Sequence, residues 1–242
     1  MDIPVNLCNR LKAARHVVAF TGAGMSAESG VPTFRDSQTG LWSNFRAEDL
    51  ATPQAFLKNP VIVWQWYASR REAISKVQPN RGHLALVQLQ TMIEKVTVVT
   101  QNIDNLHKRA GQEIVVELHG NIERVKCFEE NRVVDRFSPD EVPPTCPFCG
   151  GLLRPDVVWF GELLPAEEFK RAEEACGQCD VLLVIGTSGV VYPAAALPQL
   201  AVQSGAYVVE VNPERTPFSR HADVSLQGPS GKLLPEILEC LT

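Results

Sequence analysis

An apolar run leads into a glycine-rich turn in the stretch HVVAFTGAGMSAESG, residues 16–30. The apolar residues are largely β-branched and do not alternate with polar ones, which is typical of a strand buried on both faces of a parallel sheet. Gly22, Gly24 and Ala27 fit the spacing of a dinucleotide-binding turn, where glycine lets the backbone approach a pyrophosphate. This spacing alone is also compatible with an ordinary turn between a strand and a helix.

Three further apolar runs have the same character, at residues 96–100, 181–185 and 207–211. Segments with helical spacing lie between them, such as residues 82–93 and 166–176. Alternating strands and helices predict an α/β fold with a doubly wound, parallel, Rossmann-like sheet. Polar or glycine-rich tips follow all four runs. Because parallel strands end at the same edge of a sheet, we expect these tips to form one nucleotide site.

Two segments depart from this pattern and predict a second, smaller domain. Residues 40–80 are rich in aromatic side chains and look helical, whereas residues 121–151 contain three cysteines and several prolines. Together they predict a helical insertion with a zinc-ribbon-like cysteine module. The nucleotide-binding domain is then expected to comprise residues 1–39, 81–120 and 152–242.

Composition excludes several classes of protein. The chain has 242 residues, of which 45% are hydrophobic and 21% charged, so it is globular rather than disordered or fibrous. A net charge of −5 lacks the basic surplus of nucleic-acid-binding proteins. Residues 181–209 carry no charge, but glycines and prolines interrupt them, so we expect no membrane span. The N-terminus lacks a signal-peptide pattern and the seven cysteines do not resemble a secreted framework, which favours a cytoplasmic location.

The glycine-rich turn does not fit an ordinary nicotinamide dehydrogenase. Gly30 and Pro32 interrupt the helix early, and no second strand ends in an acidic residue about 20 residues further on. Residues 22–35 instead resemble the cofactor loop of the sirtuins, which are NAD-dependent protein-lysine deacylases.

Other sirtuin motifs occur in the family's order along the whole chain. They are similar to TQNID at residues 100–104, LHG at 118–120, VWFGE at 158–162 and GTS at 186–188. The resemblance implies that NAD is consumed: the acyl-lysine carbonyl oxygen attacks C1′ of the nicotinamide ribose, nicotinamide leaves, and the acyl group ends on ADP-ribose.

The resemblance also implies the roles of individual residues. His119 matches the general base, which suits a side chain whose ordinary pKa lies near neutrality. Asn102 matches a second catalytic residue that also positions the cofactor. The implied cofactor-binding residues are Gly22, Ala23, Gly24, Ser26, Ala27, Thr33, Phe34, Arg35, Trp42, Gln101, Asn102, Ile103, Asp104, Gly186, Thr187 and Ser188. Position at the sheet edge adds Asn212, Glu214 and Ser230.

Tyr67 and Arg70 bear on the acyl group. Three residues apart on a helix, they share one face, where a phenol and a guanidinium can bind a carboxylate. This pair resembles class III sirtuins, which remove succinyl, malonyl or glutaryl groups; the alternative is a solvated helix face. The resemblance further implies that an acyl-lysine peptide lies between the domains and pairs as an extended strand with Val158, Trp159 and Phe160.

The cysteine module departs from the family pattern. Sirtuins of this kind hold zinc with two Cys-x-x-Cys pairs, and Cys146 and Cys149 form one such pair. The other pair retains Cys127, but Glu130 stands where its second cysteine is expected. Three thiolates with Glu130, Asp135 or water as the fourth ligand can hold zinc. The sequence leaves open whether the metal is bound or has been lost.

Two other functions remain open from the sequence. One is an NAD-dependent mono-ADP-ribosyltransferase that uses the same loop. The other is a non-catalytic sensor of NAD or ADP-ribose, which has no need of a base such as His119. The expected partners are acyl-lysine proteins or peptides.

Overall fold

The main sheet of the computed structural model has the strand order β3-β2-β1-β6-β7-β8, with all strands parallel. This is the order of the Rossmann dinucleotide-binding fold, with its topological switch point between β1 and β6. The structure describes residues 3–31, 46–138 and 140–241. The sheet consists of β1 (His16–Thr21), β2 (Lys95–Thr100), β3 (Val115–Glu117), β6 (Val181–Ile185), β7 (Tyr207–Asn212) and β8 (Val224–Gln227).

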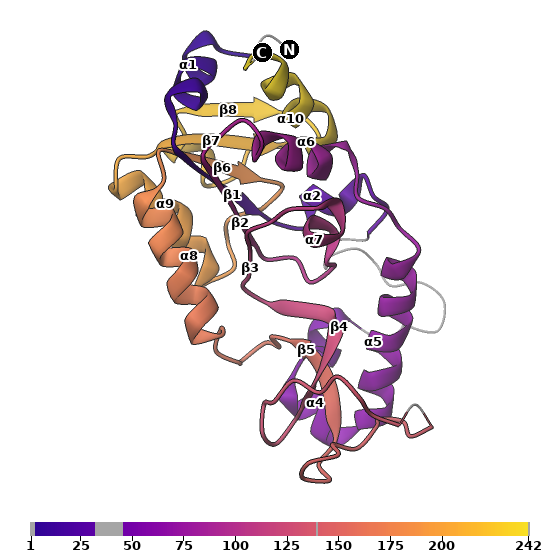
Figure 1. Cartoon of the computed structure of the whole chain (residues 1–242). Coiled ribbons are helices and arrows are strands. Elements are labelled where there is room, and N and C mark those ends of the chain that lie inside the picture. Colours follow the sequence, from indigo (N-terminus) through magenta and orange to yellow (C-terminus); the bar gives the residue numbers. More distant parts are fainter. Residues whose placement is uncertain (1–2, 32–45, 139, 242) are drawn as a thin grey trace.

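Helices cover both faces of this sheet (Figure 1). One face packs against α1 (Val5–Ala13), α6 (Arg81–Leu89) and α10 (Ser230–Glu239), and the other against α8 (Ala166–Gln178) and α9 (Leu197–Gln203). The predicted doubly wound fold is therefore confirmed.

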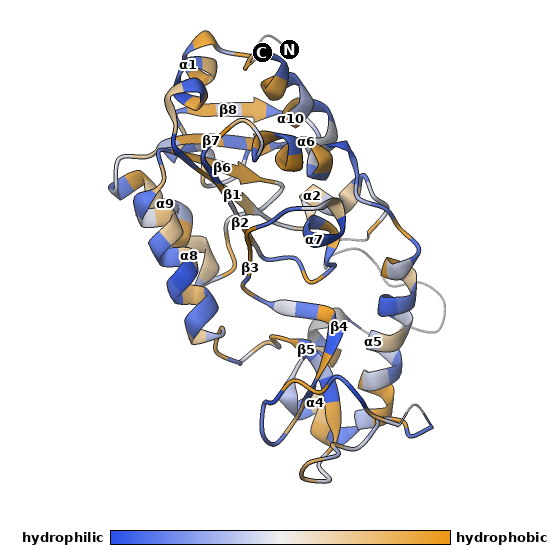
Figure 2. Ribbon diagram, in the orientation of Figure 1, coloured by the Kyte–Doolittle hydropathy of each residue, from blue (hydrophilic) through white to orange (hydrophobic). Residues whose placement is uncertain are grey.

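Successive side chains of β1 lie alternately on the two faces of the sheet. Val17 and Ala19 pack in one core, and Val18 and Phe20 in the other. This double burial explains the unbroken apolar run in the sequence, and the strands of the main sheet are largely orange in Figure 2. Strands β3 and β8 were not predicted, because edge strands of three and four residues carry too little apolar sequence to stand out.

The smaller module lies at the other end of the molecule (Figure 1). Its antiparallel pair is β4 (Gly120–Cys127) and β5 (Leu153–Val157), which packs on α3 (Ala47–Leu50), α4 (Pro53–Lys58) and α5 (Pro60–Ser75). Since β5 pairs with β4 and not with the main sheet, it belongs to this module. The domain boundaries expected from the sequence, including the one at residue 152, stay predictions.

A disulfide joins Cys8 of α1 to Cys240, directly after α10, with 5.8 Å between the two Cα atoms. The partners lie 232 residues apart, so no local spacing in the sequence indicates this pairing. The cross-link ties together the two chain ends, which lie side by side in Figure 1. The sequence interpretation did not anticipate it.

Residues 181–209 fold into β6, a loop that ends in a short 3-10 helix, α9 and the start of β7, and their glycines and prolines lie between the two strands. In the described parts of the chain, no helix has the length and apolar character needed to cross a membrane.

Candidate active site

The loops after β1 and β6 pack tightly against each other at the switch point. The backbone N–H of Gly22 donates to the carbonyl of Ile185 at 3.0 Å. A Cβ on Gly22 would lie 2.7 Å from Cβ of Thr187, and one on Gly186, whose φ is +58°, would lie 2.4 Å from the backbone nitrogen of Met25. The space beside Gly22 is thus filled by the β6 loop. Gly22 therefore allows the two loops to pack closely, and the approach of a pyrophosphate to this turn, inferred from the sequence, stays a prediction.

The polar loop after β2 joins this cluster. The side-chain amide of Asn102 donates to the carbonyl of Gly22 at 3.0 Å and to the hydroxyl of Ser26 at 3.2 Å. Ser26 in turn donates to Asp104 at 2.7 Å, and the other oxygen of Asp104 accepts from the N–H of Leu106 at 3.0 Å. Burial raises the pKa of Asp104, and these two hydrogen bonds oppose the rise. Ser26 and Asp104 therefore order the loop around Asn102.

His119 lies between β3 and β4, and its Nδ1 is 2.8 Å from the backbone carbonyl oxygen of Gln101. A carbonyl only accepts hydrogen bonds, so Nδ1 carries the proton and Nε2 keeps its lone pair. Burial lowers the pKa of His119, so the imidazole is neutral at pH 7. The side chain of Gln101 donates to the hydroxyl of Thr187 at 2.9 Å, so Gln101 links His119 to the β6 loop.

Glu210 on β7 is a buried residue that the sequence interpretation missed, with only 1% of its surface exposed. It accepts hydrogen bonds from the hydroxyls of Thr216 and Ser219 at 2.5 Å each and from Ser225 at 2.8 Å. These bonds order the loop after β7. The only sequence signal is one acidic residue inside an otherwise apolar strand.

Most of the predicted cofactor residues lie on the loops at this edge of the sheet. Asn212 donates from its side-chain amide to the carbonyl of Thr187 at 2.9 Å. The hydroxyl of Ser230 is buried and has no hydrogen-bond partner within the described chain. Thr33, Phe34, Arg35 and Trp42 lie outside the described residues. The remaining predicted residues are Ala23, Gly24, Ala27, Ile103, Ser188 and Glu214, which follow β1, β2, β6 and β7.

Tyr67 and Arg70 do not form a solvated face of α5. Only 3% of Tyr67 is exposed, and its hydroxyl oxygen accepts from Nε1 of Trp159 at 3.0 Å. The guanidinium of Arg70 lies 5.1 Å from the ring centre of Trp66. Nε of Arg70 is buried with no hydrogen-bond partner among the residues that the structure describes. The pair therefore places donors inside the smaller module.

The backbone N–H groups of residues 158–160, directly after β5, already donate hydrogen bonds within the chain. The N–H of Val158 binds the carbonyl of His119 at 2.9 Å, and that of Trp159 binds the carboxylate of Glu162 at 2.8 Å. The N–H of Phe160 donates to the carbonyl that follows α3, at 2.9 Å. Pairing of a peptide with this segment, as predicted, therefore has to use carbonyl groups, of which that of Trp159 already accepts from the N–H of Glu162 at 3.0 Å. Trp159 is 1% exposed, so its side chain packs in the core.

Residues 22–193 match the family model described as "Sir2 family". This chain belongs to the Sir2 family. It is 52% identical over 236 residues to NAD-dependent protein deacylase 2 of Pyrobaculum aerophilum, which covers 97% of this chain and 94% of that protein. It is 50% identical over 236 residues to the NAD-dependent protein deacylase of Thermococcus kodakarensis, covering 94% and 91%.

Solved Sir2 structures share the fold. A complex of a Sir2 homologue with NAD superposes with a TM-score of 0.92 at 43% identity and covers 99% of this chain and 94% of that one. A Sir2 complex with a p53 peptide and NAD⁺ superposes with a TM-score of 0.85 at 31% identity, covering 99% and 98%.

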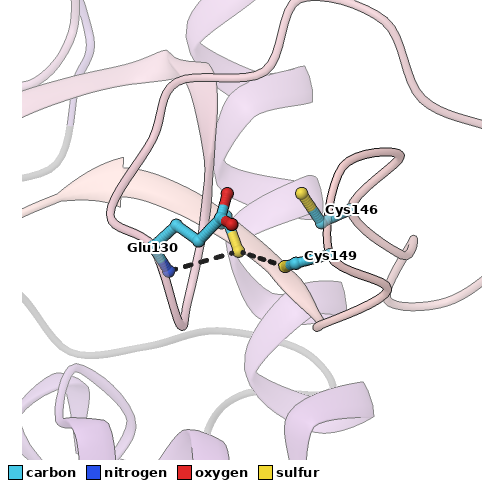
Figure 3. Close-up of side chains that lie close together, drawn as sticks. Glu130, Cys146 and Cys149 are labelled. Atoms are coloured by element: carbon cyan, nitrogen blue, oxygen red, sulfur yellow. Dashed lines mark hydrogen bonds between the residues drawn. The ribbon is translucent and has the colours of Figure 1, made fainter.

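In this Sir2-family chain the cysteine module brings together a complete set of metal ligands (Figure 3). The ligand atoms of Cys127, Glu130, Cys146 and Cys149 all lie within 4.8 Å of one another. The backbone N–H of Glu130 donates to the sulfur of Cys127 at 3.4 Å. Three thiolates and a carboxylate suit tetrahedral Zn²⁺. Of the fourth ligands considered from the sequence, the structure places Glu130 in the cluster and not Asp135.

We expect the purified protein to hold about one zinc ion per chain and Glu130→Ala to hold it more weakly. Loss of a ligand should cost at least the roughly 10–100-fold in affinity that loss of an outer-shell partner costs. Metal content measured by mass spectrometry after dialysis against a graded chelator tests this. Asp135→Ala is the matched control and should retain zinc like the wild type. A wild-type protein without stoichiometric zinc would contradict the assignment.

Proposed function

We propose that this Sir2-family protein is an NAD-dependent protein-lysine deacylase that prefers acyl groups ending in a carboxylate, such as succinyl, malonyl or glutaryl. The observation that carries the proposal is a pair of donors one helical turn apart. The hydroxyl of Tyr67 accepts from Trp159, and its own proton has no acceptor among the described residues. Nε of Arg70 is buried and likewise has no acceptor in the described parts of the chain. Buried donors without partners are costly, and a carboxylate satisfies both.

NAD fits the edge of the sheet where the loops after β1, β2, β6 and β7 meet, and the unpartnered hydroxyl of Ser230 supports a polar ligand there. When bound, NAD supplies the electrophilic C1′ and the nicotinamide leaving group. His119 keeps a proton on Nδ1 through the carbonyl of Gln101 and accepts a ribose hydroxyl proton at Nε2. Asn102 is held by Gly22 and Ser26 in a position to orient the cofactor.

The substrate is proposed to be an acyl-lysine segment of a protein, bound in an extended conformation along residues 158–160. The carbonyl groups of this segment and the loop at residues 189–192 would pair with it. On the sequence features given above, the proposed location is the cytoplasm.

Nicotinamide release with two peptides tests the function. A peptide carrying succinyl-lysine and the same peptide carrying acetyl-lysine are each incubated with NAD and the protein. We expect nicotinamide and free lysine in equal amounts, faster from the succinyl peptide. ADP-ribose attached to protein would instead support the ADP-ribosyltransferase. Binding of NAD without nicotinamide release would support the sensor.

Arg70→Met is expected to reduce the preference for succinyl over acetyl peptide by about 10- to 150-fold. A hydrogen bond to a charged group contributes about 1.5–3 kcal/mol, and acetyl-lysine offers no carboxylate to Arg70. The ratio of kcat/KM for the two peptides is the quantity to measure. Arg71→Met is the control at the next position. Nε of Arg71 donates a hydrogen bond to the carbonyl of Ile122, so this guanidinium already has a partner. Equal loss of both activities in Arg70→Met would count against the carboxylate pocket.

A further inference from the structure

We propose that Trp159 is a specificity-determining positioning residue, whose indole N–H holds the hydroxyl oxygen of Tyr67 and so turns the hydroxyl proton toward the acyl carboxylate. The inference rests on the proposed carboxylate preference and adds a residue that the Tyr67–Arg70 motif does not contain.

The hydrogen bond between the two side chains has a fixed direction. Nε1 of Trp159 can only donate, so the oxygen of Tyr67, 3.0 Å away, has to accept. Both residues are buried, with 1% and 3% of their surfaces exposed, and their ring centres are 6.4 Å apart. Burial also raises the pKa of Tyr67, so the phenol keeps its proton over the working pH range. With its accepting site occupied, the hydroxyl has one proton left to donate to a ligand.

Trp159 is itself held on two sides. The guanidinium carbon of Arg154 lies 3.3 Å from the centre of the Trp159 ring. Arg154 binds both carboxylate oxygens of Glu162, at 2.5 and 2.9 Å. Glu162 in turn accepts from the backbone N–H of Trp159 at 2.8 Å. This clamp fixes both the ring and the backbone of Trp159, so the indole N–H presents a rigid donor to Tyr67.

The arrangement predicts an effect that depends on the acyl group. An acyl chain with a terminal carboxylate uses the oriented proton of Tyr67, whereas an acetyl group ends in a methyl group and offers no acceptor beyond the carbonyl that reacts. Without the indole N–H, the hydroxyl of Tyr67 is free to rotate about its C–O bond. Loss of the N–H should therefore weaken succinyl turnover more than acetyl turnover.

A double-mutant cycle tests the inference. The variants are Trp159→Phe, which removes the N–H and keeps an aromatic ring, Tyr67→Phe, and the two combined. We expect Trp159→Phe to lower the succinyl-to-acetyl ratio of kcat/KM by about 2- to 10-fold, as for one neutral hydrogen bond. In the Tyr67→Phe background, the same change should lower the ratio by less than about 2-fold, because Trp159 acts through the Tyr67 hydroxyl.

Two further variants separate positioning from packing. Trp64→Phe changes a buried tryptophan of α5 that packs edge-on against Phe137 in the neighbouring core, and it should leave the ratio as in the wild type. Glu162→Gln weakens the clamp while leaving the indole intact. It therefore tests the role of Trp159 even if the Trp159→Phe variant does not fold. It is expected to lower the same ratio.

The outcomes distinguish this inference from the function on which it rests. A wild-type protein with no preference for succinyl peptide would overturn the carboxylate proposal itself. A wild-type preference that Trp159→Phe and Glu162→Gln both retain would overturn only the role of Trp159. Losses that multiply independently in the double variant would also show that Trp159 does not act through Tyr67.

Discussion

Replacing His119 with alanine is expected to reduce NAD-dependent deacylation by about 10²- to 10⁴-fold, the usual contribution of a positioned general base. Nδ1 of His119 is bound to the carbonyl of Gln101, so Nε2 is the atom available to accept a proton. Alanine removes this acceptor but leaves the loops around Asn102 intact. The measurement is kcat/KM for the succinyl peptide, with NAD binding followed by calorimetry to show that the cofactor site survives.

The pH dependence provides an independent check on His119. Burial lowers its pKa from the ordinary 6.5, so the imidazole remains deprotonated at lower pH than a free histidine. The decrease of kcat/KM toward acidic pH should accordingly have its midpoint below pH 6.5. The residual activity of His119→Ala should not show this decrease. His221→Ala, at an exposed position, is the matched control. A His119→Ala enzyme with more than about a tenth of wild-type activity would contradict the assignment of the base.

Removing the Cys8–Cys240 disulfide is expected to lower the free energy of unfolding by about 2–5 kcal/mol. The cross-link joins residues 232 positions apart, and in the chain-entropy model such a long loop loses much freedom in the unfolded state. The double variant Cys8→Ser/Cys240→Ser should melt about 4–20 °C below the wild type, since each kcal/mol shifts Tm by about 2–4 °C in a chain of this size.

A reductant provides the control for this prediction. Reduced wild type should melt near the double variant, whereas the double variant should not respond to the reductant. None of the other five cysteines forms a disulfide in the structure, so they contribute no second cross-link to the comparison. Equal melting of the oxidised wild type and the double variant would show that α1 and α10 are held by packing alone.

Local sequence patterns were sufficient to predict an element wherever its consecutive residues are all buried. Each residue of the run at 17–20 is buried on one face or the other of β1, so the run itself predicts a central strand. The four runs and the helices between them predict the doubly wound sheet, and the polar tips predict the edge at which the candidate site lies. The edge strands β3 and β8 were not predicted because they are short.

Only the tertiary structure shows which residues far apart in the sequence contact one another. Gly22 is a glycine because the β6 loop packs against it, and Ser26 and Asp104 order the loop around Asn102. Such contacts depend on which strands become neighbours, which spacing within one segment does not encode. The same holds for the choice of Glu130 over Asp135 beside the cysteines.

The sequence by itself determined the fold class and the edge of the sheet at which the candidate site lies. Only the tertiary structure decided that Tyr67 is buried under Trp159, that Glu210 orders the loop after β7, and that Cys8 meets Cys240. The physical reason is that a strand or helix follows from the periodicity of its own residues. A hydrogen bond or disulfide between remote residues exists only once packing of the whole chain has brought the two partners together.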